Sequence, residues 1–223
     1  MVVIQYIRFD EQLPGALFEL YLNTMPEKDR QSITRFLRWQ DKEAALYGKA
    51  LLMAGLRGFF KSSDCSLHDI STNEWGRPFF KNSGIDFNIS HTDGCVVCII
   101  TDEGRTGIDI ELIRDIDTDD FRRHMSDKQW QEIAADGSYV SFYKYWTMKE
   151  SVIKGEGRGL SIPLADVLTD TQGTAALYGY RWNLTEVFID NRYVCYAATD
   201  FSIEPGIIAA EVCLRDIPVS VLQ

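Results

Sequence analysis

The sequence lacks the long apolar segments and the regular cysteine pattern that would assign it to several large protein classes. No apolar run approaches the roughly 18 residues of a membrane-spanning helix, and charge interrupts residues 1–8 before a signal peptide could form. The five cysteines are odd in number and scattered through 223 residues, which favours reduced thiols over a disulfide framework. We therefore expect a cytoplasmic protein with no membrane partner.

Positive charge is also scarce, which argues against nucleic acid as a partner. The 23 lysines and arginines face 33 aspartates and glutamates, and the resulting formal charge of -10 repels polyanions. The charge is unevenly distributed, because residues 20–61 carry eight bases and four acids whereas residues 109–120 carry six acids and one base. These segments are either two solvated faces or one region that attracts anions and another that attracts cations.

Motifs of several common enzyme classes are missing as well. The chain contains no GxxxxGK[ST] phosphate loop and no GxSxG nucleophile elbow. The glycine-rich stretch at residues 155–159 follows a predicted helix instead of linking a strand to a helix. Cys95 and Cys98 stand three apart in a predicted strand and should face opposite sides, which argues against zinc or dithiol chemistry.

The spacing of apolar residues predicts an α+β fold. Helical periodicity is expected over residues 27–60 in two pieces, over 126–135 after a Ser126/Gln129 capping box, and over 141–154. Strands are expected over residues 85–89, then a hairpin of 95–101 and 107–112 around a turn at 102–105, then 181–189, 193–199 and 207–214. This order predicts two α+β halves that meet near residue 105.

Three carboxylates form a candidate metal site. Asp109 and Glu111 stand two apart in a predicted strand, so their side chains share a face. Oxygen ligands in this arrangement suit Mg²⁺, and Glu150 in the helix of residues 141–154 could supply a third. The alternatives are an outward-facing strand edge for the first two residues and a helix ion pair of Glu150 with Lys154.

Two further segments contribute polar or basic side chains. Ser90 and His91 end a strand before a turn, where His91 is a candidate phosphate ligand or proton carrier, or else a hydrogen-bonded structural residue. Arg77 precedes Pro78, which restricts the local backbone, and is a candidate ligand for an anion or part of a surface turn.

Four segments together resemble the 4'-phosphopantetheinyl transferases, specifically the longer, pseudo-dimeric surfactin-type (Sfp-type) enzymes. The segments are Trp75–Pro78, Phe87–His91, Gly107–Glu111 and Trp146–Lys154, in the family's order. The resemblance implies two pseudo-symmetric α+β subdomains, residues 1–104 and 105–223, with the C-terminal segment returning and the active site in the cleft between them. It also implies transfer of phosphopantetheine from coenzyme A to a serine of an acyl or peptidyl carrier protein, with release of 3',5'-ADP.

The resemblance further implies roles for individual residues. Asp109, Glu111 and Glu150 would coordinate Mg²⁺, with Mn²⁺ as an alternative. The residues expected to bind coenzyme A are Lys28, Arg30, Arg77, Pro78, Ser90, His91, Lys149 and Lys154. The catalytic residues would be Glu150, Lys154 and His91, with Glu150 either the general base or only a metal ligand, and Lys154 stabilising the leaving phosphate.

The chain departs from the family at bases near the nucleotide. Ala44, Ala45 and Gln31 stand where some relatives have bases, so nucleotide binding would depend on Arg30, Lys42 or Lys49.

For the carrier protein we expect a docking patch around Arg122, Arg123, Met125 and Trp130, although Met125 and Trp130 could equally be core. A complete site between two halves would let a monomer work. The competing functions are a Mg²⁺-dependent coenzyme A pyrophosphate hydrolase and an inactive coenzyme A or carrier-protein binding module.

Overall fold

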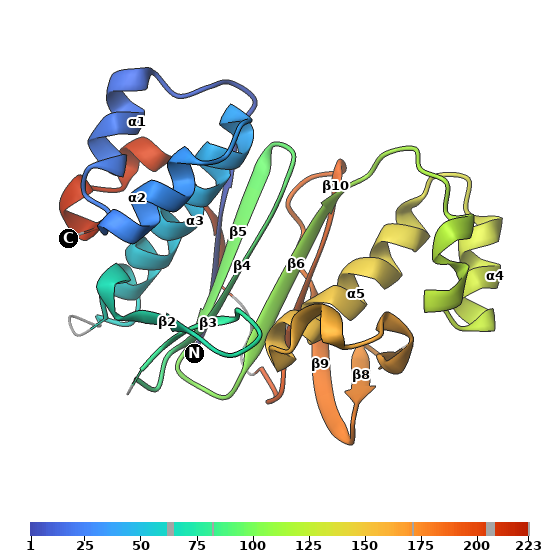
Figure 1. Ribbon diagram of the computed structural model, residues 1–223. Coiled ribbons are helices and arrows are strands. Elements are labelled where there is room, and N and C mark those ends of the chain that lie inside the picture. Colours follow the sequence, from blue (N-terminus) through green and yellow to red (C-terminus); the bar gives the residue numbers. More distant parts are fainter. Residues whose placement is uncertain (62–64, 82, 171, 204–207, 223) are drawn as a thin grey trace.

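The protein is built from two β-sheets that lie between helices (Figure 1). The computed structural model describes residues 1–61, 65–81, 83–170, 172–203 and 208–222. Helices and strands occur in separate runs along the chain, with the helices of residues 15–58 before the strands of residues 70–112 and the helices of residues 127–156 before the strands of residues 168–211, which confirms the predicted α+β class. Figure 1 shows α3 (Trp39–Gly58) on one side of the sheets and α5 (Val140–Glu156) on the other.

The first sheet has the strand order β11-β1-β5-β4. Its strands are β1 (Val2–Arg8), β4 (Asp86–Thr92), β5 (Cys95–Thr101) and β11 (Ile208–Glu211). Three helices, α1 (Gly15–Leu22), α2 (Glu27–Thr34) and α3, belong to this half, and the last two confirm the two helical pieces predicted over residues 27–60. A short hairpin of β2 (Ile70–Thr72) and β3 (Pro78–Phe80) precedes β4.

The second sheet has the strand order β6-β10-β9-β8-β7. Its strands are β6 (Thr106–Leu112), β7 (Leu168–Thr169), β8 (Thr174–Leu177), β9 (Tyr180–Glu186) and β10 (Tyr193–Thr199). Helix α5 packs on β6 and β10, and α4 (Asp127–Ala135) packs on α5. The capping box predicted for α4 is confirmed, because the Gln129 backbone N–H donates to Ser126 Oγ at 3.2 Å.

Side chains of β4 join the two sheets by bonding to the backbone of β6. The N–H groups of Thr106, Ile108, Ile110 and Leu112 donate to the side-chain oxygens of Asp86, Asn88, Ser90 and Thr92, over 2.8, 3.0, 3.4 and 3.2 Å respectively. Alternate residues of β4 therefore satisfy alternate N–H groups of a sheet edge that would otherwise lack partners. We call this contact the seam.

The backs of the two sheets pack together in an apolar layer. Ile4 of β1 and Ile99 of β5 belong to the same buried cluster as Ile108 and Ile110 of β6 and Cys195 of β10. Cys95 lies in this layer and Cys98 in the core under α3, as the strand periodicity predicts. All five cysteines are free thiols.

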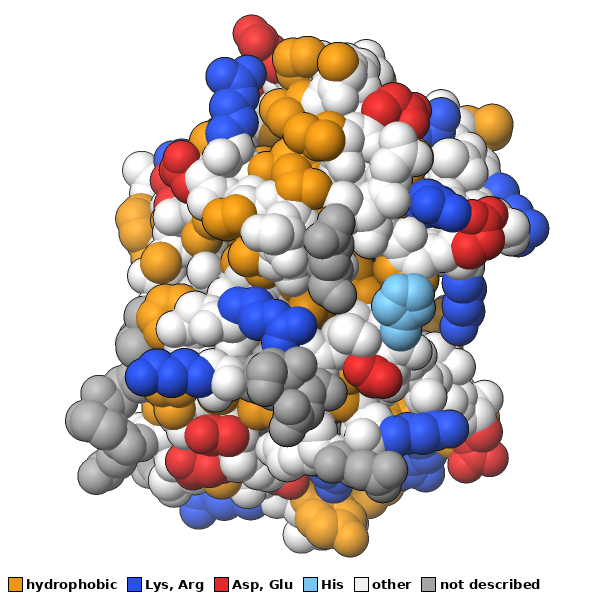
Figure 2. Space-filling model, turned by 90° about the vertical axis from the view of Figure 1, so that its left-hand side faces the viewer, with side chains coloured by type: hydrophobic (Ala, Val, Ile, Leu, Met, Phe, Trp, Pro, Cys, Tyr) orange, Lys and Arg blue, Asp and Glu red, His pale blue; other side chains and the backbone are white. Residues whose placement is uncertain are grey.

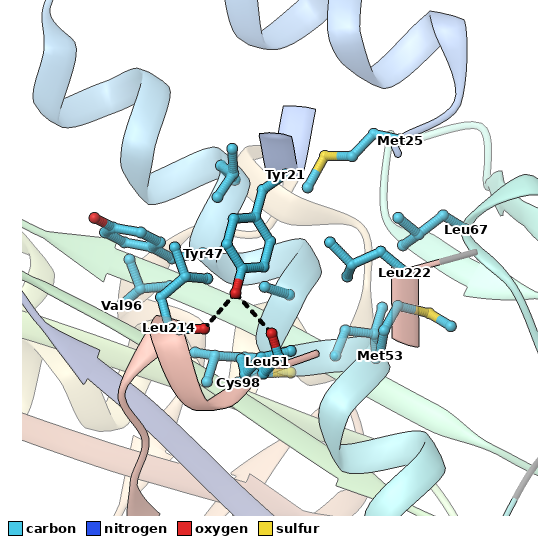
Figure 3. Packing of buried hydrophobic residues seen from close by; sticks show 14 of the residues in the cluster. Tyr21, Met25, Tyr47, Leu51, Met53, Leu67, Val96, Cys98, Leu214 and Leu222 are labelled. Carbon is cyan, nitrogen blue, oxygen red and sulfur yellow. Dashed lines mark hydrogen bonds between the residues drawn. The ribbon is translucent and has the colours of Figure 1, made fainter. Parts of the chain in front are cut away.

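The C-terminal segment completes the core of the first half (Figure 3). Strand β11 pairs in parallel with β1, and the one-turn helix Val219–Leu222 packs on α3. Buried Tyr21 of α1 donates its hydroxyl to the carbonyl oxygens of Leu214 and Ile217, over 2.7 and 2.6 Å. The first half therefore depends on residues from both ends of the chain.

Two glycines bring α5 unusually close to β6. A Cβ atom on Gly107 would lie 2.0 Å from the carbonyl oxygen of Ser151 and 2.4 Å from the nitrogen of Gly155. A Cβ on Gly155 would meet the ring of Trp182 at 2.7 Å. Only glycine allows this backbone approach, which places the last turn of α5 directly over the start of β6.

The predicted hairpin of residues 95–101 and 107–112 is wrong. The turn at residues 102–105 connects two strands that belong to different sheets. Strand β5 is already paired with β1 and β4, and β6 pairs with β10. Because β5 has neighbours on both edges, it offers no free edge to β6.

Among the described residues, no helix is long and apolar enough to cross a membrane.

Candidate active site

Ser90, Asp109 and Lys154 meet at the centre of the seam. The Lys154 ammonium on α5 donates to Asp109 Oδ1 at 2.6 Å and to Ser90 Oγ at 2.7 Å. Ser90 in turn donates to Asp109 Oδ1 at 3.0 Å. The close packing at Gly107 makes this possible, because it brings the last turn of α5 onto the start of β6, two residues before Asp109. We call these three residues the seam cluster.

Two further carboxyl groups stand beside the seam cluster and resist ionisation. Burial and, second, the charge of Asp109 raise the pKa of Glu111 to about 7. Burial and Asp109 likewise raise the pKa of Glu150. Three carboxyl groups from β6 and α5 thus share one region, where their mutual repulsion calls for a cation.

The donor chemistry of this region fits a metal ion. Asp109 is 4% exposed, and its Oδ2 atom is buried without a hydrogen-bond partner. Such an atom is costly unless a ligand satisfies it. Among the described residues, no group of three or more His, Cys, Asp or Glu side chains is already arranged to hold a metal ion. Binding by Asp109, Glu111 and Glu150 therefore stays a prediction.

His91 lies next to the seam cluster, in a cavity at the end of the seam. The cavity is lined by residues from both halves, among them Phe9, Arg38, Asp41, His91, Glu111 and Arg114. Partial desolvation, followed by the charge of Lys154, lowers the pKa of His91. His91 is therefore biased toward the neutral imidazole, which can accept a proton or a hydrogen bond.

Two arginines from different halves share one carboxylate beside this cavity. Arg38, just before α3, donates to Asp93 Oδ1 at 3.0 Å, and Arg114, just after β6, donates to Asp93 Oδ2 at 3.5 Å. Asp93 lies in the turn between β4 and β5. Arg38, Asp93 and Arg114 are not among the predicted site residues. The seam beside them is visible in the sequence as the polar alternation of Asp86, Asn88, Ser90 and Thr92.

A second cavity lies on the other side of Lys154. Its lining comprises Trp75, Gly76, Arg77, Pro78, Asn88, Ile89, Ile153, Lys154, Gly157 and Gly159. Pro78 and Lys154, both predicted to bind coenzyme A, thus face a common cavity. The two cavities together present apolar walls, a central ammonium group and an exposed aromatic ring, Trp75, which is 49% exposed. This combination suits a ligand that has both a flat ring and phosphates.

Arg77 also borders this cavity, but its guanidinium group is engaged by protein atoms. It forms a bidentate pair with Asp86, over 2.9 and 2.7 Å. It also donates to the carbonyl oxygens of Lys154 and Thr106, over 3.0 and 3.1 Å. A guanidinium has five N–H groups, and these four hydrogen bonds leave one for a ligand.

The structure contradicts the predicted role of Lys149 in binding coenzyme A. Lys149 is 2% exposed, and its ammonium donates to the carbonyl oxygens of Leu164 and Val167. Burial lowers its pKa to about 8. Adjacent helix residues differ by about 100° in direction, so the neighbour of Glu150 points into the core of the second half instead of the site.

The basic segment of residues 20–61 does not form a single cationic patch. Arg30 pairs with Glu27, and Lys49 pairs with Asp29 at 3.0 Å. Figure 2 shows lysine and arginine side chains scattered over the face that it presents, with acidic side chains among them. Lys28 is exposed at the start of α2, and among the described residues neither Lys28 nor Arg30 lines the two cavities above.

The predicted docking patch contains one core residue. Met125 is 6% exposed and belongs to the core of the second half, on which Trp130 packs. Arg122 stacks over the Trp130 ring at 5.5 Å and pairs with Asp127. The patch that can reach a partner is therefore formed by Arg122, Arg123 and the outer face of Trp130.

Comparison with known proteins agrees with this geometry. Residues 105–200 match the 4'-phosphopantetheinyl transferase superfamily, and residues 15–103 match the N-terminal region of 4'-phosphopantetheinyl transferases. The chain is 30% identical to the 4'-phosphopantetheinyl transferase gsp of Aneurinibacillus migulanus over 83% of this chain and 78% of that protein. It is 31% identical to the 4'-phosphopantetheinyl transferase Sfp of Bacillus subtilis over 71% of each chain. The protein is therefore a transferase of the Sfp-type 4'-phosphopantetheinyl transferase family.

Proposed function

We propose that the protein transfers the 4'-phosphopantetheine group of coenzyme A to a serine of an apo acyl or peptidyl carrier protein and releases 3',5'-ADP. The observation that supports this most strongly is the seam cluster, where Lys154 and the carboxylates of β6 and α5 meet between two cavities. Residues 1–104 and 105–223 would be the two subdomains, each contributing one wall.

Coenzyme A would lie along the seam. Trp75 and Pro78 offer an apolar surface to the adenine, and Lys154, Ser90 and His91 stand where the pyrophosphate would pass. Lys28 and Arg30 would reach the 3'-phosphate from α2. Since Lys154 lines the second cavity and its ammonium lies in the seam cluster, it would hold the bridging phosphates and stabilise the charge that develops on 3',5'-ADP.

The attacking nucleophile belongs to the carrier protein, so the enzyme has to position the serine hydroxyl and accept its proton. Burial and Asp109 raise the pKa of Glu150, which makes this carboxylate a better base than a solvated one. Glu150 would take the proton as the serine oxygen bonds to the β-phosphorus of coenzyme A. The bond from that phosphorus to the oxygen of 3',5'-ADP breaks, and the proton passes to the solvent or the product.

Asp109, Glu111 and Glu150 would hold Mg²⁺ or Mn²⁺ in this site. When bound, the metal would neutralise part of the negative charge of the pyrophosphate. Asp109 offers the unpartnered Oδ2 atom. The two raised carboxyl pKa values would fall beside a cation, so Glu150 acts either as a metal ligand or as the general base. Lys154 would then be free to turn from Asp109 toward the phosphates.

The carrier protein would meet the surface of Arg122, Arg123 and Trp130. Such carriers are generally acidic, so these bases offset the repulsion from an enzyme of net charge -10. Binding of the carrier should weaken with added salt if this contact is electrostatic. Affinity that does not change with salt would exclude the patch as an electrostatic docking site.

The intact masses of apo carrier proteins incubated with enzyme and coenzyme A test the proposed reaction. We expect a gain of one phosphopantetheine that requires Mg²⁺ and is abolished by EDTA. Tight binding of coenzyme A without a mass gain on any carrier would instead indicate a binding module. Cleavage of coenzyme A in the absence of a carrier would indicate a pyrophosphate hydrolase.

A further inference from the structure

The last turn of α5 is held by side chains from the other half of the protein. This helix carries both Glu150 and Lys154, so the position of its end decides where these groups lie. Gly157 closes the helix with a left-handed backbone (φ 98°), and its N–H donates to the Ile153 carbonyl at 2.9 Å. The remaining carbonyl groups of the last turn need other donors.

Two of those donors come from the β2–β3 hairpin, while Arg105 Nη1, just before β6, donates to the Glu156 carbonyl at 3.3 Å. Arg77 Nε donates to the Lys154 carbonyl at 3.0 Å, and Asn73 Nδ2 donates to the Gly157 carbonyl at 3.0 Å. The Arg77 stem also lies flat on the glycine, since a Cβ atom on Gly157 would be 2.5 Å from Arg77 Cδ. A positive charge at a helix C-terminus is favourable in itself.

Asp86 fixes the direction of this arginine. It binds Arg77 with both carboxylate oxygens and accepts the Thr106 N–H at 2.8 Å. Arg77 returns a hydrogen bond to the Thr106 carbonyl at 3.1 Å. Both side chains are largely buried, at 12% and 14% exposure, so the pair is shielded from solvent. The start of β6 and the end of α5 are thereby tied to one ion pair.

We propose that Asn73, Arg77 and Asp86 form a clamp that positions the last turn of α5, and that Arg77 acts through Lys154 rather than as a ligand of coenzyme A. We call this set the α5 clamp. The clamp holds the backbone of Lys154. The position of this backbone determines whether the Lys154 ammonium reaches Ser90 and Asp109. Arg77 is then a positioning residue. The inference rests on the proposed function for the role of Lys154, but the clamp itself rests on the contacts above.

The clamp and a ligand role for Arg77 predict different kinetics. Under the clamp, Arg77→Gln lowers kcat on the order of 10- to 100-fold, because a small displacement of a catalytic group is costly, while KM for coenzyme A changes less than about 3-fold. Asp86→Asn should lower kcat in the same direction, although Asp86 does not line the cavity. The double variant should be little worse than Arg77→Gln alone, since both changes break one unit.

If Arg77 is a ligand of coenzyme A, its substitution should change KM and not kcat. Arg77→Gln would then raise KM for coenzyme A with kcat retained, and Asp86→Asn would not reproduce it. Arg77→Lys separates the two as well. It keeps the charge that a phosphate needs but loses the bidentate geometry, so it should restore little activity if the clamp is correct and most of the affinity if Arg77 is a ligand.

Hydrogen exchange tests the clamp without any reaction. We expect the amides of residues 154–157 to exchange about 10-fold or more faster in Arg77→Gln and in the milder Asp86→Asn, while α4 is unchanged. Arg8→Gln is the matched control, because Arg8 forms a bidentate pair with Glu211 away from α5. Unchanged exchange at residues 154–157 in both clamp variants would overturn the proposal. If the wild-type protein modifies no carrier, the proposed function fails, and the exchange measurement still decides on the clamp.

Discussion

Lys154 and Asp109 are the residues on which the proposed chemistry depends most. One ammonium group lies among three carboxyl groups, and two of these have raised pKa values. Residue types and spacing made Asp109, Glu111 and Glu150 candidate metal ligands, and the resemblance to the transferase family joined Lys154 to them. These observations could not indicate that Lys149 points into the core, because that depends on how α5 is rotated on the sheet.

Lys154→Ala should lower kcat on the order of 100-fold, because the leaving phosphate loses its nearest positive charge. Steady-state kinetics with a modified carrier as the readout would measure this. The matched control is Lys144→Ala, a change at an exposed lysine on the same helix, which should leave kcat unchanged. Equal turnover in Lys154→Ala and the wild type would remove Lys154 from the mechanism.

Glu111 should make the metal-free protein less stable as the pH rises. Its pKa is about 7 in the folded state against 4.5 when exposed, so the folded state retains a proton that the unfolded chain has lost. The stability linked to this group is therefore complete below about pH 4.5 and is lost as the pH rises through 7.

Replacing the Glu111 carboxyl group tests whether it lowers the free energy of unfolding as the pH rises. In EDTA, Glu111→Gln should gain up to about 3 kcal/mol in free energy of unfolding relative to the wild type at pH 8, and much less at pH 4.5. Urea denaturation at the two pH values measures the difference. A gain that is equal at both pH values would contradict the raised pKa.

At the scale of helices and strands, the active site depends on how closely α5 approaches β6. The helices at residues 27–60, 126–135 and 141–154 follow from apolar period and capping residues, and their positions are confirmed with ends shifted by a few residues. The pairing of strands did not follow in the same way. The short turn at residues 102–105 is typical of a hairpin. However, β1 and β4 pair with the two edges of β5, so β6 pairs with β10 instead.

Gly107→Ala should destabilise the protein by about 3 kcal/mol or more, because its Cβ would overlap the backbone of Ser151 and Gly155. Activity should fall with it, since the same approach places Lys154. Thermal or urea unfolding measures the first effect. The control is Gly58→Ala at the end of α3, where a Cβ meets no atom within 4 Å and where stability should be unchanged or slightly higher. Equal stability of the two variants would contradict the close approach.

At the scale of the whole molecule, the two halves are joined by the seam, by the apolar layer between the sheets and by the returning C-terminal segment. The order of predicted elements suggested two α+β halves, and this division stays a prediction. The pairing of β1 with β11 could not be predicted, because the pattern of residues within a strand does not specify which strand it pairs with.

Tyr21→Phe tests the attachment of the C-terminal segment. The change removes the donor hydroxyl from the Leu214 and Ile217 carbonyl groups. The Leu214 carbonyl still accepts the Ile217 N–H at 3.0 Å, so the loss falls mainly on the Ile217 carbonyl, and an unsatisfied buried acceptor costs on the order of 1–3 kcal/mol. We expect a lower urea midpoint and faster amide exchange over residues 214–222. A midpoint equal to that of the wild type would show that this attachment does not stabilise the first half.

Transfer to a carrier protein, and not hydrolysis, is the reaction that we propose for the seam. It can be tested by measuring 3',5'-ADP and modified carrier in the same reaction with coenzyme A, Mg²⁺ and an apo carrier. We expect equal amounts of the two products, no 3',5'-ADP without the carrier, and neither product from Asp109→Ala. Release of 3',5'-ADP that does not require the carrier, or carrier modification by Asp109→Ala at the wild-type rate, would contradict this proposal.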